Sequence, residues 1–145
     1  MRVSMGADYA ARAVLDLAQR YGMGPVRSSE IAKRQQIAES FLEQIMRGLR
    51  KAGIVRSTRG PRGGHELAFP PSDVTLKAVV EAVDGPCAGP AACMPDDFCV
   101  AMRGCVLQDV WRELANAYSA VLGSVTFEQL VQRRAELEAR AVYQI

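Results

Sequence analysis

The chain has very little histidine and no long apolar stretch, and each shortage argues against a class of protein. Its 145 residues include one histidine, four cysteines and no pair of cysteines separated by two residues. A thiol oxidoreductase normally has such a pair, or a base beside its reactive cysteine, so we do not expect an enzyme. No apolar run approaches the ~20 residues that cross a bilayer, so we expect no membrane partner.

The beginning of the sequence also lacks the charged head, apolar run and small-residue cleavage site of a secretory signal. We therefore expect a cytoplasmic protein, in which paired disulfides are rare. There is no internal repeat, and 49% of the residues are hydrophobic. A chain of this length and composition can bury a core as one domain, or as a small domain with an appendage.

Charge is divided unevenly along the chain, although the net charge is only +2. Residues 1–66 contain 12 Lys and Arg against 6 Asp and Glu, a balance of +6, whereas residues 67–145 contain 6 against 10, a balance of −4. A basic first half suggests that this half meets a polyanion such as DNA. Ordinary scatter of solvated charges is the alternative that composition alone leaves open.

The first half of the sequence predicts three helices and a β-hairpin. A second helix can start from a serine N-cap at Ser28 or Ser29, and a third covers residues 38–53 with Ser40 and Glu43 as a capping box. Short strands at 54–57 and 65–69 then flank a basic, glycine-rich loop. This is the order of a winged helix-turn-helix. The first helix is predicted to face inward with Ala10, Val14, Leu17, Ala18 and Tyr21.

The predicted third helix separates polar from apolar side chains in a way that suits DNA. Its polar residues fall in a band about 100° wide, opposite an apolar face made of Leu42, Ile45, Met46, Leu49 and Ala52. Polar and cationic side chains on such a helix can read base edges in the major groove, and a wing arginine suits a narrow minor groove. An ordinary amphipathic surface helix is the alternative. The predicted DNA-contacting residues are Arg2, Ser40, Phe41, Glu43, Gln44, Arg47, Lys51, Arg59, Gly60, Pro61, Arg62 and Gly63.

All four cysteines lie in one stretch, at intervals of six: Cys87, Cys93, Cys99 and Cys105. Residues six apart are rotated by about 240° around a helix, so these thiols cannot share one helical face. The prolines and glycines among them predict a loop that folds back and gathers thiolates. The spacing alone leaves four interpretations open: an iron–sulfur cluster, a zinc ion, redox-active thiols, or inert cysteines.

The wing sequence and the cysteine spacing together resemble the Rrf2 family of bacterial transcription regulators. The segment from Arg50 to Gly64 is similar to the family's wing, residues 42–45 to its reading helix, and residues 70–85 to the segment before its cysteine loop. The resemblance covers about residues 1–132. It implies a homodimer, a repressor or an activator, that binds a double-stranded DNA operator under the control of a 2Fe–2S or 4Fe–4S cluster.

The resemblance also implies which residues would hold the cluster. Three ligands stand at the family's spacing, namely Cys93, Cys99 and Cys105. Gln108 stands where one group of members has a histidine ligand, and a neutral amide is a poor iron ligand. Asp8, donated by the partner subunit, is therefore the preferred fourth ligand, and Cys87 is the alternative.

The C-terminal part predicts a long helix over residues 107–122 with a broad apolar stripe, which we expect to form the dimer seam. Packing of this helix on its own N-terminal domain is the alternative. A final helix should start at Thr126, with Gln129 completing a capping box. The single histidine, His65, is interpreted as a strand residue and not as a ligand.

The sequence thus predicts a mainly α-helical fold with a small β-hairpin. Residues 1–83 would form the winged helix-turn-helix domain with a linker helix, residues 84–105 the cysteine loop, and residues 106–145 the dimerisation helix and a C-terminal helix. The predicted function is a dimeric transcription regulator whose operator binding depends on an iron–sulfur cluster. A zinc- or thiol-switch regulator with the same wing is the alternative.

Overall fold

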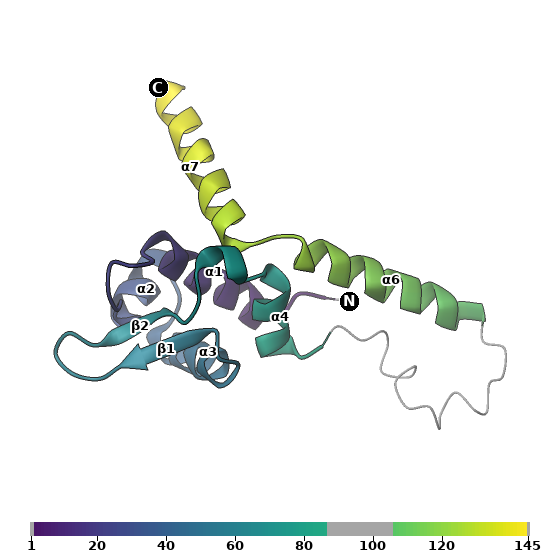
Figure 1. Cartoon of the computed structure of the whole chain (residues 1–145), viewed down its shortest axis with the longest axis horizontal. Coiled ribbons are helices and arrows are strands. Elements are labelled where there is room, and N and C mark those ends of the chain that lie inside the picture. The colour runs from purple at the N-terminus through teal and green to yellow at the C-terminus, as the bar shows by residue number, and fades with distance from the viewer. Residues whose placement is uncertain (1, 87–105, 145) are drawn as a thin grey trace.

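The computed structural model of the chain describes residues 2–86 and 106–144. Within these ranges a body of short helices carries a two-stranded hairpin, and two long helices leave the body in different directions (Figure 1). The predicted mainly α-helical fold with a small hairpin is confirmed. The elements are α1 (Met5–Gln19), α2 (Ser28–Gln35), α3 (Glu39–Lys51), β1 (Val55–Thr58), β2 (Gly64–Leu67), the 3-10 turn η1 (Pro71–Asp73), α4 (Leu76–Asp84), α6 (Val106–Gly123) and α7 (Phe127–Tyr143).

Helix α1 lies at the centre of the body, because the side chains on its inner side are small. Ala7, Ala10 and Ala13 are fully buried, and the helix packs against α2, α3, α4 and α7. A Cβ added to Gly6 would lie 3.2 Å from a methyl group of Val83, so α1 and α4 are in close contact where α1 begins. Small residues at these positions let four helices approach α1 closely.

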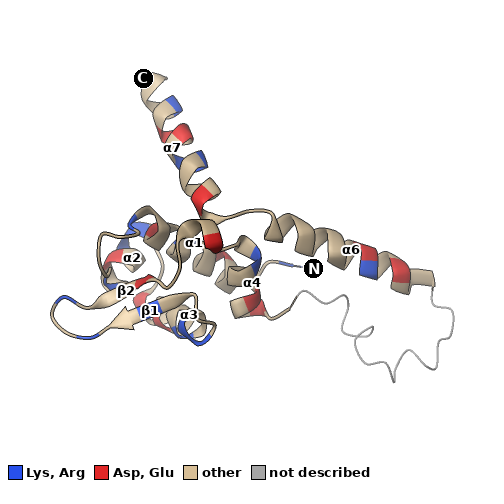
Figure 2. Ribbon diagram, viewed as in Figure 1, with Lys and Arg blue, Asp and Glu red and all other residues tan. Residues whose placement is uncertain are grey.

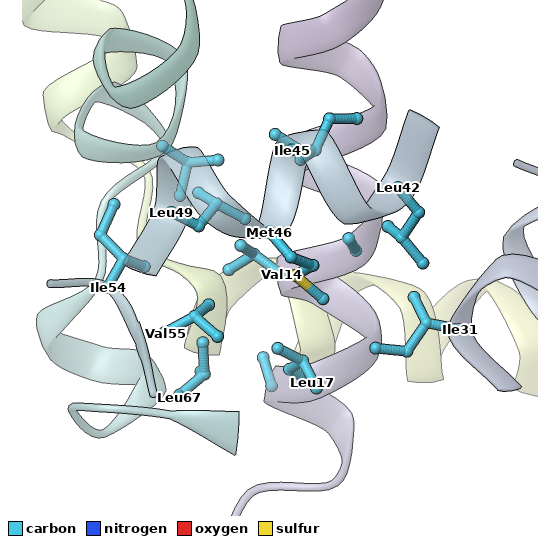
Figure 3. Packing of buried hydrophobic residues seen from close by; sticks show 14 of the residues in the cluster. Val14, Leu17, Ile31, Leu42, Ile45, Met46, Leu49, Ile54, Val55 and Leu67 are labelled. Atoms are coloured by element: carbon cyan, nitrogen blue, oxygen red, sulfur yellow. The ribbon is translucent and has the colours of Figure 1, made fainter. Parts of the chain in front are cut away.

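Helix α3 supplies much of the core that the winged-helix elements share. Its buried residues are Leu42, Ile45, Met46 and Leu49, as the helical wheel predicted. Figure 3 shows them packed with Val14, Leu17, Ile31, Ile54, Val55 and Leu67. Side chains from α1, α2, α3 and both strands therefore meet in one cluster. This cluster fixes the orientation of α3, and with it the direction in which the outer face of α3 points.

Several local predictions for the helix ends are wrong. The N-cap of α3 is Ala38, without a side-chain hydrogen bond, so Ser40 and Glu43 do not form a capping box. Because the helix already starts at Glu39, these two residues lie within its first turns. Ala52, predicted to face inward, is exposed at the C-cap position.

The first two helices differ from the prediction in similar ways. Tyr21 is 47% exposed, because α1 ends at Gln19 and the tyrosine lies beyond the helix. The N-cap of α2 is Arg27 and not Ser28 or Ser29, and α2 has no side-chain cap hydrogen bond. The hydroxyl group of Ser28 is used instead in a contact with the hairpin.

Helix α7 begins inside the core although it is last in the sequence. Phe127 is fully buried, and its backbone N–H donates to the carbonyl of Val74 at 2.9 Å. The predicted capping box of Thr126 and Gln129 is confirmed. From this anchor α7 continues away from the body to Tyr143 (Figure 1).

Helix α6 leaves its apolar side chains largely uncovered. It has no buried residue, and it extends from the body as an arm that contacts α4 (Figure 1). Five of its apolar side chains are between 46% and 80% exposed, namely Val106, Leu107, Val110, Leu114 and Val121. In residues 2–86 and 106–144, no helix combines the length and the apolar character that crossing a bilayer requires.

Candidate nucleic-acid interface

The predicted reading face of α3 lies on the outside of the body. Ser40, Gln44, Arg47 and Lys51 are all exposed, and their spacing of four, three and four residues places them along one side of the helix. Glu43 is half-buried beside them. Side chains that can pair with base edges therefore lie towards the start of α3, and cations that can neutralise phosphate follow towards its end.

Phe41 lies at the edge of this face and connects it to α1. The ring is 37% exposed and packs edge-to-face on Tyr9, with centroids 5.7 Å apart and an interplanar angle of 81°. A groove of about 220 Å³ separates α1, α3 and α4 at this point. It is lined by Gly6, Phe41, Gln44, Ile45, Gly48, Ala82 and Val83. The reading helix thus shares a groove with the last turn of α4.

The hairpin projects as a basic wing beside α3, and Figure 2 shows Lys and Arg positions on the wing loop and at α3. Arg59, Gly60, Pro61 and Arg62 are exposed, and Gly60 has φ of +113°, which favours glycine. A Cβ at Gly63 would lie 2.2 Å from the carbonyl oxygen of Thr58, so the tight loop requires glycine there. Arg59 and Arg62 are thereby carried on a narrow loop that can approach a duplex closely.

The wing loop is also held from α2. The guanidinium group of Arg27 donates from Nη2 to the carbonyl oxygen of Pro61 at 2.5 Å. At the other end of the hairpin, Val26 and His65 form a backbone bridge with N–H···O distances of 2.8 and 2.7 Å. The segment before α2 therefore runs beside β2 and contacts the wing at its root and near its tip.

His65 lies on β2, as predicted, but it is buried and bound on both ring nitrogens. Nε2 is 2.7 Å from Oγ of Ser28, and Nδ1 is 2.9 Å from Oγ of Ser57. Ser57 also accepts from Nη1 of Arg50 at 3.0 Å. Burial lowers the pKa of His65, the charge of Glu43 raises it, and the charge of Arg50 lowers it. The wing root, meaning the part of the hairpin around His65 and Ser57, is thus held by a hydrogen-bond network that joins α2, α3 and both strands.

A buried carboxylate, Asp16, fixes the relation of α1 to α2. It is fully buried, accepts from Nε of Arg34 at 3.0 and 3.1 Å, and forms an ion pair with Arg20. Removing one member of a buried ion pair leaves the other without compensation, which is strongly destabilising. Asp16 therefore supports the first two helices on which the reading helix rests.

Arg2 precedes α1 and so belongs neither to α3 nor to the wing. It is exposed before the start of α1, and the N-terminus lies away from the wing, towards α4 and α6 (Figure 1). The structure therefore groups the predicted contacts of α3 and the wing on neighbouring elements and leaves Arg2 apart from the wing.

The predicted cluster ligands are only partly within the described residues. Cys87, Cys93, Cys99 and Cys105 lie outside them. Asp8 lies on α1 with 45% of its side chain exposed, and its carboxylate accepts from Nη2 of Arg12 at 2.9 Å. Gln108 lies in the first turn of α6. In the part of the chain that the structure describes, no group of three or more His, Cys, Asp or Glu side chains could hold a metal ion.

The last turn of α4 is tied directly to the start of α1. The carboxylate of Asp84 accepts the backbone N–H of Ser4 at 3.0 Å and also the Ser4 hydroxyl. Oγ of Ser4 in turn accepts the N–H of Ala7 at 3.0 Å and caps α1. This contact joins residues 80 positions apart, so no local sequence pattern indicated it. In the sequence, Asp84 lies three residues before Cys87, the first cysteine.

Both the sequence and the winged-helix fold match a known family. The sequence matches the Rrf2 family, described as an iron-dependent transcriptional regulator, over residues 3–133. The chain belongs to the Rrf2 family. Its Rrf2-type relatives include the HTH-type transcriptional regulator IscR of Yersinia pseudotuberculosis, 36% identical over 138 residues that cover 95% of this chain and 84% of the relative. IscR of Serratia proteamaculans is 36% identical over 134 residues, covering 92% and 81%.

Solved structures agree with the Rrf2 assignment. IscR of T. potens has a TM-score of 0.78 at 32% identity, covering 94% of this chain and 90% of that one. CymR, the global cysteine regulator of B. subtilis, has a TM-score of 0.78 at 28% identity, covering 92% and 98%. The predicted resemblance is confirmed. As an Rrf2 member the protein is a transcriptional regulator with a DNA-binding winged helix, and not an enzyme.

Proposed function

We propose that the protein is a homodimeric regulator whose operator affinity depends on an iron–sulfur cluster held by Cys93, Cys99 and Cys105. The observation that carries this proposal is where the cysteine segment is attached. It follows α4, which packs on α1 and α3, and it precedes α6, whose apolar side chains are uncovered. A group that ties the cysteines together would therefore connect the support of the reading helix to the helix that joins two subunits.

The proposed DNA contacts come from two elements. Gln44 and Arg47 on α3 would face base edges and phosphates in the major groove, while Arg59 on the wing would enter the minor groove or reach phosphate. The exposure of these side chains on adjacent elements supports this assignment. A dimer would present two such faces to half-sites one helical turn, or a multiple of it, apart.

A second copy of the chain is the proposed cover for α6. Leu107, Val110, Leu114 and Val121 recur at steps of three, four and seven residues, so they lie on one side of the helix, and each is at least 46% exposed. A symmetric homodimer buries the same patch twice, once from each subunit. At 18 residues, the helix is long enough to form several such apolar contacts along the dimer interface.

The donors of this chain suit an iron–sulfur cluster. Thiolates are the usual ligands of such clusters, and three cysteines leave one position for a different donor. The carboxylate of Asp8 is accessible on α1 and could be donated to the partner subunit if its ion pair with Arg12 opened. Cys87 is the alternative donor. When bound, a cluster of this kind cross-links the segments that supply its ligands and responds to oxygen, nitric oxide or iron supply.

Asp84 is the proposed link between the cysteine segment and the reading helix. Its carboxylate holds Ser4, which caps α1, and the neighbouring Val83 lies against Gly6. Any displacement at the end of α4 is therefore passed to the start of α1 and to the groove that α3 shares with both helices.

Anaerobic purification with absorption spectroscopy and analysis of iron and acid-labile sulfide tests the cluster assignment. The wild-type protein should be coloured and contain sulfide, whereas the triple variant Cys93→Ala, Cys99→Ala, Cys105→Ala should have neither property. Asp8→Ala should bleach faster in air than the wild type, and Cys87→Ala should behave like the wild type. A fully coloured triple variant would rule the assignment out.

A thiol- or zinc-switch regulator is the second candidate function. The observation in its favour is the structural similarity to CymR, the global cysteine regulator of B. subtilis. The same purification separates the two candidates. Zinc without sulfide, or no metal together with DNA binding that depends on thiol oxidation, would support the switch and contradict the cluster.

A further inference from the structure

Two side chains outside the predicted DNA-contacting set hold the wing against α2. We infer that Arg27 and His65 are positioning residues for DNA binding, Arg27 near the tip of the wing and His65 at its root. By fixing the hairpin they would present Arg59 to the duplex in one orientation. This inference rests on the proposed contact between the wing and DNA.

At the tip of the wing, few contacts fix the position of the loop. It is exposed from residue 59 to 62 and turns through Gly60. The bond from Arg27 to the Pro61 carbonyl at 2.5 Å spans 34 residues of sequence and ties this loop to the start of α2. A loop held in its bound geometry loses less conformational freedom when it meets its partner, so the bond should favour DNA binding without contacting DNA.

At the root, the hydrogen bonds of His65 fit a neutral imidazole. The guanidinium of Arg50 can only donate, so Oγ of Ser57 accepts from it and can give its own hydrogen to Nδ1 of His65. Nε2 then carries the ring proton and donates to Oγ of Ser28. The network therefore fits a neutral imidazole, with every member satisfied.

Protonation of His65 would disturb this arrangement. Both ring nitrogens would then donate, and the Ser57 hydroxyl would have to reverse while accepting from two cations. The charged groups that act on the imidazole are both on α3: Arg50 opposes the added charge, and Glu43 partly offsets it. Burial also lowers the pKa of His65, so at neutral pH the imidazole is neutral and its bonds to Ser28 and Ser57 are intact.

A double-mutant cycle tests the role of Arg27. The probe is a duplex of about 30 base pairs, selected from a random library by the full-length wild-type protein. Arg27→Ala should weaken binding of this selected duplex about fivefold, and Arg59→Ala about tenfold, but the double variant should bind like Arg59→Ala alone. Arg133→Ala, which removes the same charge from α7, is the control and should change affinity by less than about twofold. Fully additive effects of Arg27 and Arg59 would overturn the positioning role.

The pH dependence of binding tests the role of His65, which is the single histidine of the chain. Between about pH 7.5 and 5.5, wild-type affinity for the selected duplex should fall about fivefold more than that of His65→Gln. Glutamine offers an NH₂ group that donates and a carbonyl oxygen that accepts, but it does not titrate. An equal slope in both proteins would overturn the inference. So would an affinity that rises at low pH in the wild type only, because His65 would then act as an added cation.

Hydrogen exchange of the free wild-type protein and of Arg27→Ala gives a measurement that needs no DNA. The amide of Gly63, which bonds to the Gly60 carbonyl at 2.9 Å, should exchange faster in the variant, while amides of α1 should not change. Unchanged exchange in the wing would contradict the inference about Arg27. If the exchange result holds but no selected duplex is found, the proposed DNA contact fails and the hold on the wing stands.

Discussion

The winged-helix body and helix α6 differ in how their apolar side chains are covered. In the body, residues from α1, α2, α3 and both strands form one buried cluster, and Phe127 enters it from the far end of the chain. In α6 no residue is buried, although the helix carries apolar side chains along its length. Within the described residues, the body therefore buries a shared apolar cluster, whereas α6 buries none of its apolar side chains.

The difference assigns separate tasks to the two parts. The core of the body holds α3 and the hairpin together. The exposed apolar side chains of α6 are typical of an interaction site, and a second copy of the chain is their proposed cover. In the sequence, the cysteine segment connects the two parts.

Removal of the α7 anchor should have the largest effect. Phe127→Ala deletes a fully buried ring, and core replacements of this kind lower the free energy of unfolding by about 3–5 kcal/mol. Urea denaturation measures this difference. Leu137→Ala on the exposed part of α7, where the side chain is 65% exposed, is the control and should change the free energy by less than about 0.5 kcal/mol. Equal losses in both variants would show that the core does not depend on Phe127.

Disruption of the α6 face should come next. Leu114→Asp places a charge in the proposed seam of both subunits and should raise the dimer dissociation constant about 100-fold, or about 2.7 kcal/mol. Analytical ultracentrifugation measures the constant. Asn116→Asp adds the same charge about 160° further round the helix and should leave it nearly unchanged. A Leu114→Asp protein that dimerises like the wild type would mean that α6 is covered by something else.

Removing the wing arginine Arg59 should have a smaller effect on DNA binding than Leu114→Asp has on dimerisation. Arg59→Ala should weaken binding of the selected duplex about tenfold and reduce the salt dependence of log affinity by about one phosphate contact per wing. Fluorescence anisotropy at several salt concentrations measures both quantities. A wild-type salt slope in the variant would place Arg59 away from the phosphates and the minor groove.

The smallest effect concerns pH and the stability of the body. Because the pKa of His65 is lowered in the folded protein, the unfolded chain binds more protons just below pH 6.5, and stability should fall as pH falls through this window. The loss is at most about 1.4 kcal/mol per pH unit and stops below the folded pKa. Urea denaturation at about pH 7.5 and 5.5 should show this decrease in the wild type and less of it in His65→Gln. Identical decreases would exclude His65 as the source.

The features predicted correctly from the sequence are those that local patterns encode. The buried side of α3 follows from a helical period, and the capping box of Thr126 and Gln129 from a four-residue pattern. The same pattern at Ser40 and Glu43 misled, because α3 starts one residue before it. Local patterns identify an amphipathic helix more reliably than the residue at which it begins.

The contacts that position the candidate site were not predicted, because each joins distant residues. Arg27 reaches Pro61 across 34 positions, and Asp84 reaches Ser4 across 80. His65 was placed on its strand correctly, but its burial and its bond to Ser28 depend on how α2 packs beside the hairpin. Spacing and composition carry no signal for such pairs.

Anaerobic titration of the selected duplex, before and after the iron is removed from one preparation, tests the link between the cysteine segment and the DNA-binding face most directly. The affinity of the wild type should change at least about tenfold, which is about 1.4 kcal/mol of coupling between the two sites. The triple cysteine variant should show one affinity in both treatments. Equal wild-type affinities with and without a fully formed cluster would contradict control of DNA binding through the cysteines.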